Sequence, residues 1–410
     1  MNPQLLFYLL LGIISVKFLF DTFINALNSK HFNDEIPTEL IGVYNDKEYL
    51  KSQNYKKVNY KFSLVMSTFS IVLTILFFLF DGFAFVDGIA RNISDNVVVI
   101  TIIFFGIIIF GSDILTFPFS YYKTFVIEEK FGFNKSSLKT FILDKIKSWL
   151  MMVFIGGGLL ALITWFYHLT TANFWLYAWG LISAFTIFMN MFYSKLIVPL
   201  FNKQAPLEDG ELKTAIEQFS KNVGFKLNNI FVIDGSKRST KANAYFSGFG
   251  SQKRITLYDT LINDLETDEI VAVLAHEVGH YKKKHVIYNL LLSLILTGFT
   301  LFIFSLLVGN STLSQALGVE IASFHLGLIA FTILYSPISE ITSLIMNALS
   351  RKFEYQADDY AKNNFKSEAL ISSLKKLSKN SLSNLTPNKL YVKIHYSHPT
   401  LLQRILNLKK

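Results

Sequence analysis

The sequence predicts a mainly α integral membrane protein, with seven transmembrane helices and one small cytoplasmic α/β domain. Of its 410 residues, 51% are hydrophobic and only 17% are charged, which is less charge than a soluble protein of this length carries. Seven stretches are apolar and long enough to cross a bilayer, whereas one connection between them has a soluble pattern. These observations together define the fold class.

The seven apolar stretches cover approximately residues 4–26, 62–80, 97–119, 148–168, 174–200, 286–309 and 323–348. Along the chain, connections that are rich in Lys and Arg alternate strictly with connections that have almost none. The basic segments hold six (27–61), six (120–147), twelve (201–285) and twelve (349–410), whereas the others hold one (81–96) or none (169–173 and 310–322). By the positive-inside rule the N-terminus lies outside, and the loop 201–285 and the tail lie in the cytoplasm.

The chain therefore divides into four parts, which are 1–200 (helices one to five), 201–285 (the loop), 286–348 (helices six and seven) and 349–410 (the tail). In the loop, apolar residues recur at helical spacing from Leu212 to Val223. Three segments have strand patterns: Ile230–Ile233, Asn243–Phe249 and Arg254–Tyr258. Thr267 is the expected N-cap of the following helix. Neither loop nor tail has enough apolar surface for a core, so we expect one domain built from both.

Composition also excludes some functions. The net charge of +9 raises the question of nucleic-acid binding, but the basic residues cluster in loops between apolar spans and no DNA- or RNA-binding motif is present. The chain has no cysteine, which excludes disulfides and thiolate metal ligands. A metal ion would have to be held by histidine and carboxylate.

The helix after Thr267 carries the motif His276-Glu277-Val278-Gly279-His280. Two histidines four residues apart project from one face of a helix, which suits two nitrogen ligands of one Zn²⁺. Glu277 is placed to take a proton from the attacking water. The alternative is a surface helix with two incidental histidines.

A catalytic zinc usually has three protein ligands, and the best third candidate is Glu354. Asp358 shares its helix face and would accept the second N–H of a ligand histidine. Two spans separate this pair from the motif and return the chain to the same side. The alternative is an ordinary solvated acidic helix face.

Several segments resemble the integral-membrane zinc CAAX prenyl proteases, the type I CAAX endopeptidases of the gluzincin metallopeptidases. These are Thr124–Asn134, Pro199–Lys203, Asn243–Phe246, Ser350–Asp358, and His395–Pro399 with Arg404. They extend over nearly the whole chain. The resemblance implies seven helices that enclose a water-filled chamber. It also implies one zinc ion per chain held by His276, His280 and Glu354, with Glu277 as the general base.

The resemblance also implies roles for residues outside the zinc ligands. Asp358 is described in the family as a proton donor, although an ionised Asp beside a zinc histidine is better suited to orienting that histidine. Asn243, Ala244 and Tyr245 would form an edge strand that pairs with the substrate backbone.

His398 would hold the oxyanion or the substrate, and Arg404 would brace it. Structural alternatives are a His-Pro helix entry at His398 and a plain turn or strand start at Asn243.

Asp113, Glu340 and His325 lie in the apolar spans, where a charge costs roughly 2.5–3.5 kcal/mol on insertion scales. We expect them to face the chamber or to bond between helices.

We therefore predict a zinc metalloendopeptidase that cleaves near the cytoplasmic membrane face. On the resemblance, it removes the C-terminal tripeptide of prenylated proteins. One alternative is a membrane quality-control protease of the HtpX kind, although the four spans of that group fit the seven predicted here poorly. Another is a non-catalytic metal-binding scaffold, which would not need Glu277. Expected partners are a peptide or protein substrate and membrane lipid, without nucleic acid. Short outward connections and the lack of cysteine indicate a bacterial inner-membrane protein, which leaves prenylation of the substrate open.

Overall fold

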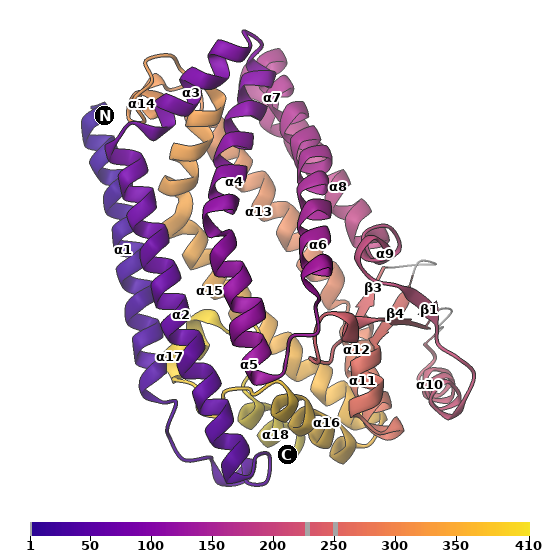
Figure 1. Cartoon of the computed structure of the whole chain (residues 1–410). Coiled ribbons are helices and arrows are strands. Elements are labelled where there is room, and N and C mark those ends of the chain that lie inside the picture. Colours follow the sequence, from indigo (N-terminus) through magenta and orange to yellow (C-terminus); the bar gives the residue numbers. More distant parts are fainter. Residues whose placement is uncertain (1, 226–229, 249–252) are drawn as a thin grey trace.

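The computed structural model of the chain describes residues 2–225, 230–248 and 253–410, so the predicted end of a strand at Phe249 lies outside the described residues. Seven helical segments of the described chain are long and apolar enough to cross a membrane, which confirms the predicted number. They stand side by side as an upright bundle (Figure 1). They are α1 (Pro3–Lys30), α2 (Asp46–Leu79), α4 with η2 and α5 (Val97–Phe131), α6 with η3 and α7 (Leu138–Thr170), α8 with α9 (Phe174–Phe201), α13 (His285–Leu307) and α15 (Phe324–Asn364).

The helices extend well past their apolar stretches. Helix α2 begins 16 residues before position 62 with a capping box, in which the backbone N–H of Glu48 donates to Asn45 and that of Asn45 donates to Glu48. Two of the spans contain π-helical turns, which are η2 (Lys123–Glu128), between α4 (Val97–Tyr122) and α5 (Glu129–Phe131), and η3 (Met152–Gly157), between α6 (Leu138–Met151) and α7 (Gly158–Thr170). No sequence pattern predicted these turns.

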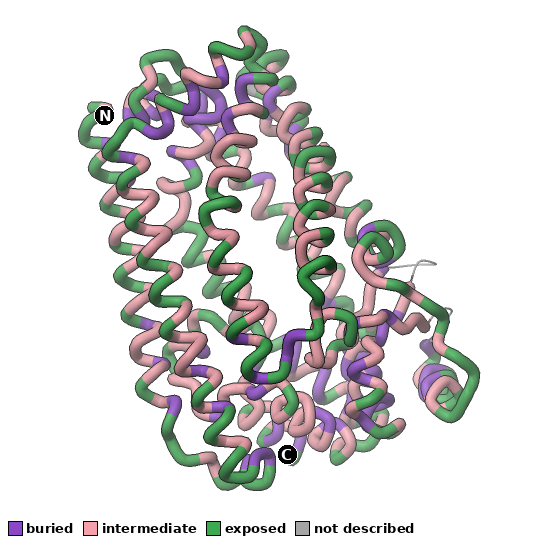
Figure 2. Tube along the Cα trace, viewed as in Figure 1, coloured by how far each residue is buried: buried purple, intermediate pink, exposed green. Residues whose placement is uncertain are grey.

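Burial is concentrated at the two ends of the bundle (Figure 2). In the seven apolar windows only 6–17% of residues are buried, as expected for helices that face lipid on one side and are not packed around a solid core. The distal end, where the N-terminus lies, is covered by α3 (Gly82–Ile93), η4 (Thr171–Asn173) and α14 (Ser311–Gln315). Two apolar clusters occupy this end.

Polar residues inside the spans bond between helices. His325 Nε2 lies 2.7 Å from Asp87 Oδ1 in the buried distal end, and Arg91 pairs with the same carboxylate at 2.7 Å. Asp113 accepts hydrogen bonds from Lys145 (2.5 Å) and from the indole of Trp149 (2.6 Å).

Glu340 pairs with Lys17 of α1. Interhelical bonding was one of the two roles expected for these residues.

The small domain contains a four-stranded sheet of order β1-β2-β4-β3. Its strands are β1 (Gln204–Pro206), β2 (Ile230–Ile233), β3 (Ala244–Ser247) and β4 (Arg254–Tyr258). Strands β2 and β4 are parallel, whereas β1 and β3 pair antiparallel with their neighbours. Three strands were predicted and β1 was not. Strand β3 is an edge strand that pairs with β4 alone among the described strands.

One apolar cluster, from Ile216 to Leu408, joins the sheet to most of the loop and tail helices. The loop helices are α10 (Glu211–Asn222), η5 (Gly235–Lys237), α11 (Asp259–Asp264) and α12 (Thr267–Lys282), and the tail helices are α16 (Ser367–Asn380), α17 (Lys389–His395) and α18 (Leu401–Leu408). A second cluster includes η1 (Thr38–Leu40), which lies in the first connection. The prediction of Thr267 as N-cap is wrong. Glu266 is the N-cap and forms a capping box with Glu269, so Thr267 is the first helical residue.

Candidate active site

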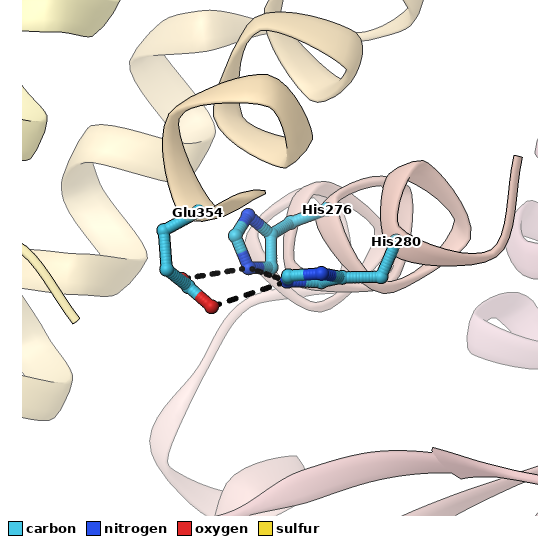
Figure 3. Close-up of side chains that lie close together, drawn as sticks. All are labelled: His276, His280 and Glu354. Atoms are coloured by element: carbon cyan, nitrogen blue, oxygen red, sulfur yellow. Dashed lines mark hydrogen bonds and ion pairs between the residues drawn. The ribbon is translucent and has the colours of Figure 1, made fainter. Parts of the chain in front are cut away.

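Helices α12 and α15 bring three predicted ligands together. His276 and His280 project from one face of α12, and Glu354 reaches toward them from α15 (Figure 3). The two Nε2 atoms lie 3.2 Å apart. Glu354 Oε2 lies 3.4 Å from His276 Nε2, and Glu354 Oε1 lies 3.2 Å from His280 Nε2. Residues 74 positions apart in the chain, His280 and Glu354, thus meet at one point.

These separations are close to those around a tetrahedral metal ion, where bonds of about 2.0–2.2 Å give ligand-to-ligand distances of roughly 3.3–3.6 Å. The two Nε2 atoms lie 3.2 Å apart, and each of them faces a different oxygen of Glu354 at 3.2–3.4 Å. One ligand atom from each of the three residues lies within 4.8 Å of the other two. Glu354 Oε2 is also buried, and its contacts with His276 Nε2 (3.4 Å) and the guanidinium of Arg404 (3.8 Å) are long for hydrogen bonds. A poorly satisfied buried carboxylate oxygen is costly, and a metal ion would remove that cost.

The close approach of the two helices depends on Gly279, which lies between the histidine ligands. A Cβ at this position would lie 3.1 Å from the Cα and the carbonyl oxygen of Ala357 and from Cβ of Tyr360. Because these neighbours are backbone or inner side-chain atoms, a larger residue would push α15 away. Gly279 therefore allows α12 and α15 to pack closely.

His276 is oriented by Asp358, whose carboxylate is fully buried. Asp358 Oδ1 lies 2.9 Å from His276 Nδ1, and the two carboxylate oxygens accept hydrogen bonds of 2.9 and 2.5 Å from Arg404. Burial and Arg404 lower the pKa of His276, but the nearby carboxylates of Asp358 and Glu354 prevail and raise it to about 9. Burial also lowers the pKa of Arg404, whereas the ion pair with Asp358 raises it above its ordinary value.

His280 has an equivalent support that sequence reasoning missed. Its Nδ1 lies 3.0 Å from Nδ1 of His285, and Nε2 of His285 lies 2.8 Å from Oε1 of Gln356. The ring of His285 stacks on Phe353 with centroids 4.1 Å apart. A usable signal was present, since His285 follows His280 by five residues and Gln356 follows Glu354 by two. Each imidazole therefore presents Nε2 to the site and Nδ1 to a fixed partner.

Glu277 and His398 lie on the wall of a cavity of about 520 Å³ that also contains the three candidate ligands. His398 Nε2 lies 3.2 Å from Glu354 Oε1, and 64% of its side chain is exposed, which leaves the ring accessible from the cavity. Arg404 lines the same cavity, but its hydrogen bonds go to Asp358 and not to His398. The predicted brace of His398 by Arg404 is therefore not what the structure contains.

The edge strand also lines the cavity. Asn243, Ala244 and Tyr245 all contribute to its wall, and β3 pairs with β4 alone among the described strands. The side chain of Asn243 accepts a hydrogen bond from the backbone N–H of Ala244, which is also what the plain strand-start alternative predicts. The hydroxyl of Tyr245 lies 3.3 Å from Ser194 of α8, so this ring is tied to the bundle.

An apolar surface completes the cavity. Leu370, Leu374 and Leu377 of α16 line it, together with Leu261 and Val273. Sequence reasoning did not assign these leucines to the site, although their spacing marks one face of a helix. The cavity thus combines a metal-sized ligand triad, a free strand edge and an apolar wall, which suits an extended peptide with apolar side chains.

Comparisons with known proteins agree with this geometry. The family model described as "CAAX prenyl protease N-terminal, five membrane helices" matches residues 25–203, and that of peptidase family M48 matches residues 206–410. A "CAAX prenyl protease 1 homolog" of Dictyostelium discoideum is 36% identical over 97% of this chain and 96% of its own length. "CAAX prenyl protease 1" of Saccharomyces cerevisiae is 33% identical over 99% of this chain and 96% of its own length.

The fold is similar to that in the crystal structure of Ste24p from S. mikatae. The TM-score is 0.94 at 33% sequence identity, and the match covers 100% of both chains. The likeness therefore includes the membrane helices as well as the small domain.

Proposed function

This chain belongs to the CAAX prenyl proteases of peptidase family M48 and is an integral-membrane metalloendopeptidase, and on that premise we propose that it removes the C-terminal tripeptide from prenylated proteins. The observation that carries the proposal is the cavity in which Glu277, three candidate metal ligands and a free strand edge meet. The names of the relatives supply the substrate class.

We propose that His276, His280 and Glu354 hold one Zn²⁺. Two imidazole nitrogens and one carboxylate oxygen are a usual ligand set of catalytic zinc, and the chain offers no thiolate. When bound, the metal ion polarises the scissile carbonyl as a Lewis acid.

Glu277 takes a proton from the attacking water and passes it to the leaving amine. Asp358 holds the ring of His276 so that Nε2 faces the site.

The substrate would lie along β3. Its backbone would pair with Asn243, Ala244 and Tyr245 as an added strand, so the position of cleavage would be set mainly by main-chain hydrogen bonds. His398, which is close to Glu354 and accessible from the cavity, would donate a hydrogen bond to the carbonyl oxygen as negative charge develops on it. The leucines of α16 would receive apolar side chains of the peptide.

We also propose that the site lies on the cytoplasmic side and the N-terminus outside, as the distribution of Lys and Arg predicts. The bacterial inner membrane stays a prediction. Compact connections do not distinguish this chain from the relatives of D. discoideum and S. cerevisiae, since both align over 96% of their own length.

The deciding experiment uses the purified protein in detergent with a farnesylated CAAX peptide and its unprenylated twin, each with and without chelator. We expect release of the terminal tripeptide from the farnesylated peptide, identified by mass, with no release after chelation or in the Glu277→Gln variant. Cleavage of both peptides at scattered bonds would favour a quality-control protease. An inert farnesylated peptide together with stoichiometric metal would favour the non-catalytic scaffold.

A further inference from the structure

The segment Thr124–Asn134, which the sequence singled out and the chemistry above does not use, contacts the loop that leads into β3. The backbone N–H of Thr240 donates to the carbonyl of Phe133 (3.1 Å), and that of Lys135 donates to Arg238 (3.0 Å). Asn134 and Ser239 form an isolated antiparallel bridge. The loop entering the edge strand is thus hydrogen-bonded to the end of a membrane helix.

Lys241 forms the centre of this junction. Its Nζ donates to Glu128 Oε2 (2.9 Å) and to the hydroxyl of Tyr55 (3.1 Å), and it lies 4.3 Å from the centre of the Phe133 ring. Tyr55 in turn donates to Glu128 Oε1 at 2.7 Å. The Glu128 side chain is 17% exposed and the Lys241 side chain is 39% exposed, so the carboxylate is the better shielded partner of this ion pair. Lys123 also lies 3.2 Å from Glu128 Oε1.

The junction joins three separate parts of the chain. Tyr55 comes from α2, Glu128 from η2 and Lys241 from the small domain. The loop is already anchored upstream, because Arg238 pairs with Asp144 of α6 at 2.7 and 2.9 Å. The contact of Lys241 is therefore not needed to dock the loop as a whole. It fixes the last residues before β3.

Lys241 precedes Asn243 by two residues, and its carbonyl accepts a hydrogen bond from Thr260 (3.2 Å). Strand β3 pairs with β4 alone among the described strands, and its residues line the cavity. Its start is held by β4, because the backbone N–H of Tyr258 donates to Asn243 (3.1 Å), and it is tied to the membrane helices by Lys241. In an extended chain one residue is about 3.3 Å long, so a shift of β3 by this amount would offer a different peptide bond.

We propose that Lys241, held by Glu128 and Tyr55, is a positioning residue that fixes β3 relative to the membrane helices and so selects the peptide bond that is cut. The inference rests on the proposed function. A substrate anchored in the membrane would be held at a fixed position relative to the membrane helices, whereas its peptide would be held by β3. The peptide bond that reaches the site therefore depends on the position of β3 relative to these helices, which the Lys241 junction maintains.

The test compares Lys241→Met with Lys241→Arg, Glu128→Gln and the control Lys237→Met. Lys237 lies in the same loop, and its side chain makes no ion pair or hydrogen bond among the described residues. For Lys241→Met we expect KM for the farnesylated peptide to rise about tenfold, with kcat nearly unchanged, since small misplacements of a substrate are costly. We also expect a second product cut one bond away, and faster amide hydrogen exchange in residues 240–247. Metal content stays at the wild-type value.

Lys241→Arg should restore the single product. Glu128→Gln keeps the side-chain shape and should reproduce the defect, so it serves as the second test if Lys241→Met folds poorly. A wild-type KM and product in both Lys241→Met and Glu128→Gln would overturn the proposal, even if exchange were faster. If the wild-type protein cleaves no farnesylated peptide, the proposed function fails. Faster exchange in Lys241→Met but not in Lys237→Met would then still support the placement of β3 by Lys241.

Discussion

The substitution Asp358→Asn separates the two roles considered for this carboxylate. Its oxygens face two sets of donors, Nδ1 of His276 at 2.9 Å and the guanidinium of Arg404 at 2.9 and 2.5 Å. An asparagine has one acceptor oxygen and one NH₂ group. The NH₂ group must face at least one of these donors, so at least one of the three hydrogen bonds is lost, together with the negative charge that pairs with Arg404.

The expected magnitude follows from this loss. Substitution of a group that orients a metal ligand typically lowers metal affinity about 10–100-fold, which corresponds to roughly 1.4–2.8 kcal/mol. Breaking a buried ion pair by removing one charge typically costs about 3–5 kcal/mol of folding stability, and only 12% of the Arg404 side chain is exposed. We therefore expect weaker zinc binding and a lower melting temperature together.

The assay is a titration with buffered zinc, followed by kcat for the farnesylated peptide at full metal occupancy. If Asp358 orients His276, kcat returns to within about threefold of wild type once the site is loaded, because the loss lies in metal affinity. A kcat that stays low at full occupancy would refute the orienting role and favour a proton donor. Asp359→Asn is the control, since Asp359 is exposed and bonds only to Asn407 among the described residues.

Further substitutions test the other assignments. Glu277→Gln should keep about one metal ion per chain and abolish cleavage, because only the base is lost; undiminished cleavage would exclude Glu277. His276→Ala should bind less than stoichiometric metal by elemental analysis, and retention of a full equivalent would exclude it as a ligand. Gly279→Leu should lower stability by about 1–3 kcal/mol through overpacking against α15 and also reduce metal affinity; a wild-type melting curve would contradict this packing role. Asp87→Asn should lower the melting temperature through loss of the buried contact with His325 while KM stays unchanged, and an altered KM would show that the distal end affects the site.

The parts of the fold that follow from short-range patterns could be predicted from the sequence. A run of apolar residues and the distribution of Lys and Arg are local properties, and they gave the seven spans. Short strand-like segments bounded by turn residues likewise gave β2, β3 and β4. Strand β1 was missed because it is three residues long and ends in Pro206, which favours turns and edges over strands.

In the site, the candidate ligands and Asp358 were predictable because they occur as two pairs of residues, each about one helical turn apart. His276 and His280 are i and i+4, as are Glu354 and Asp358. The bond between Arg404 and Asp358 depends on how α15 and α18 pack, which no local pattern reports. The support of His280 by His285 depends on the turn from α12 into α13, and it was missed although the two residues are close in the sequence. The junction at Lys241 joins residues more than a hundred positions apart and was invisible for the same reason.

Helix α15 has a mechanical consequence, because its 41 residues cross the membrane and then supply Glu354 without a break. From the middle of its apolar part, near residue 336, Glu354 is 18 residues away, or about 27 Å along the helix axis. A rocking of the helix by about 5° would move that carboxylate by roughly 2 Å, whereas metal coordination tolerates only about 0.2 Å. Because the tilt of a membrane helix is set by packing against its neighbours and by its interfacial anchors, these distant contacts would be coupled to the geometry of the proposed metal site.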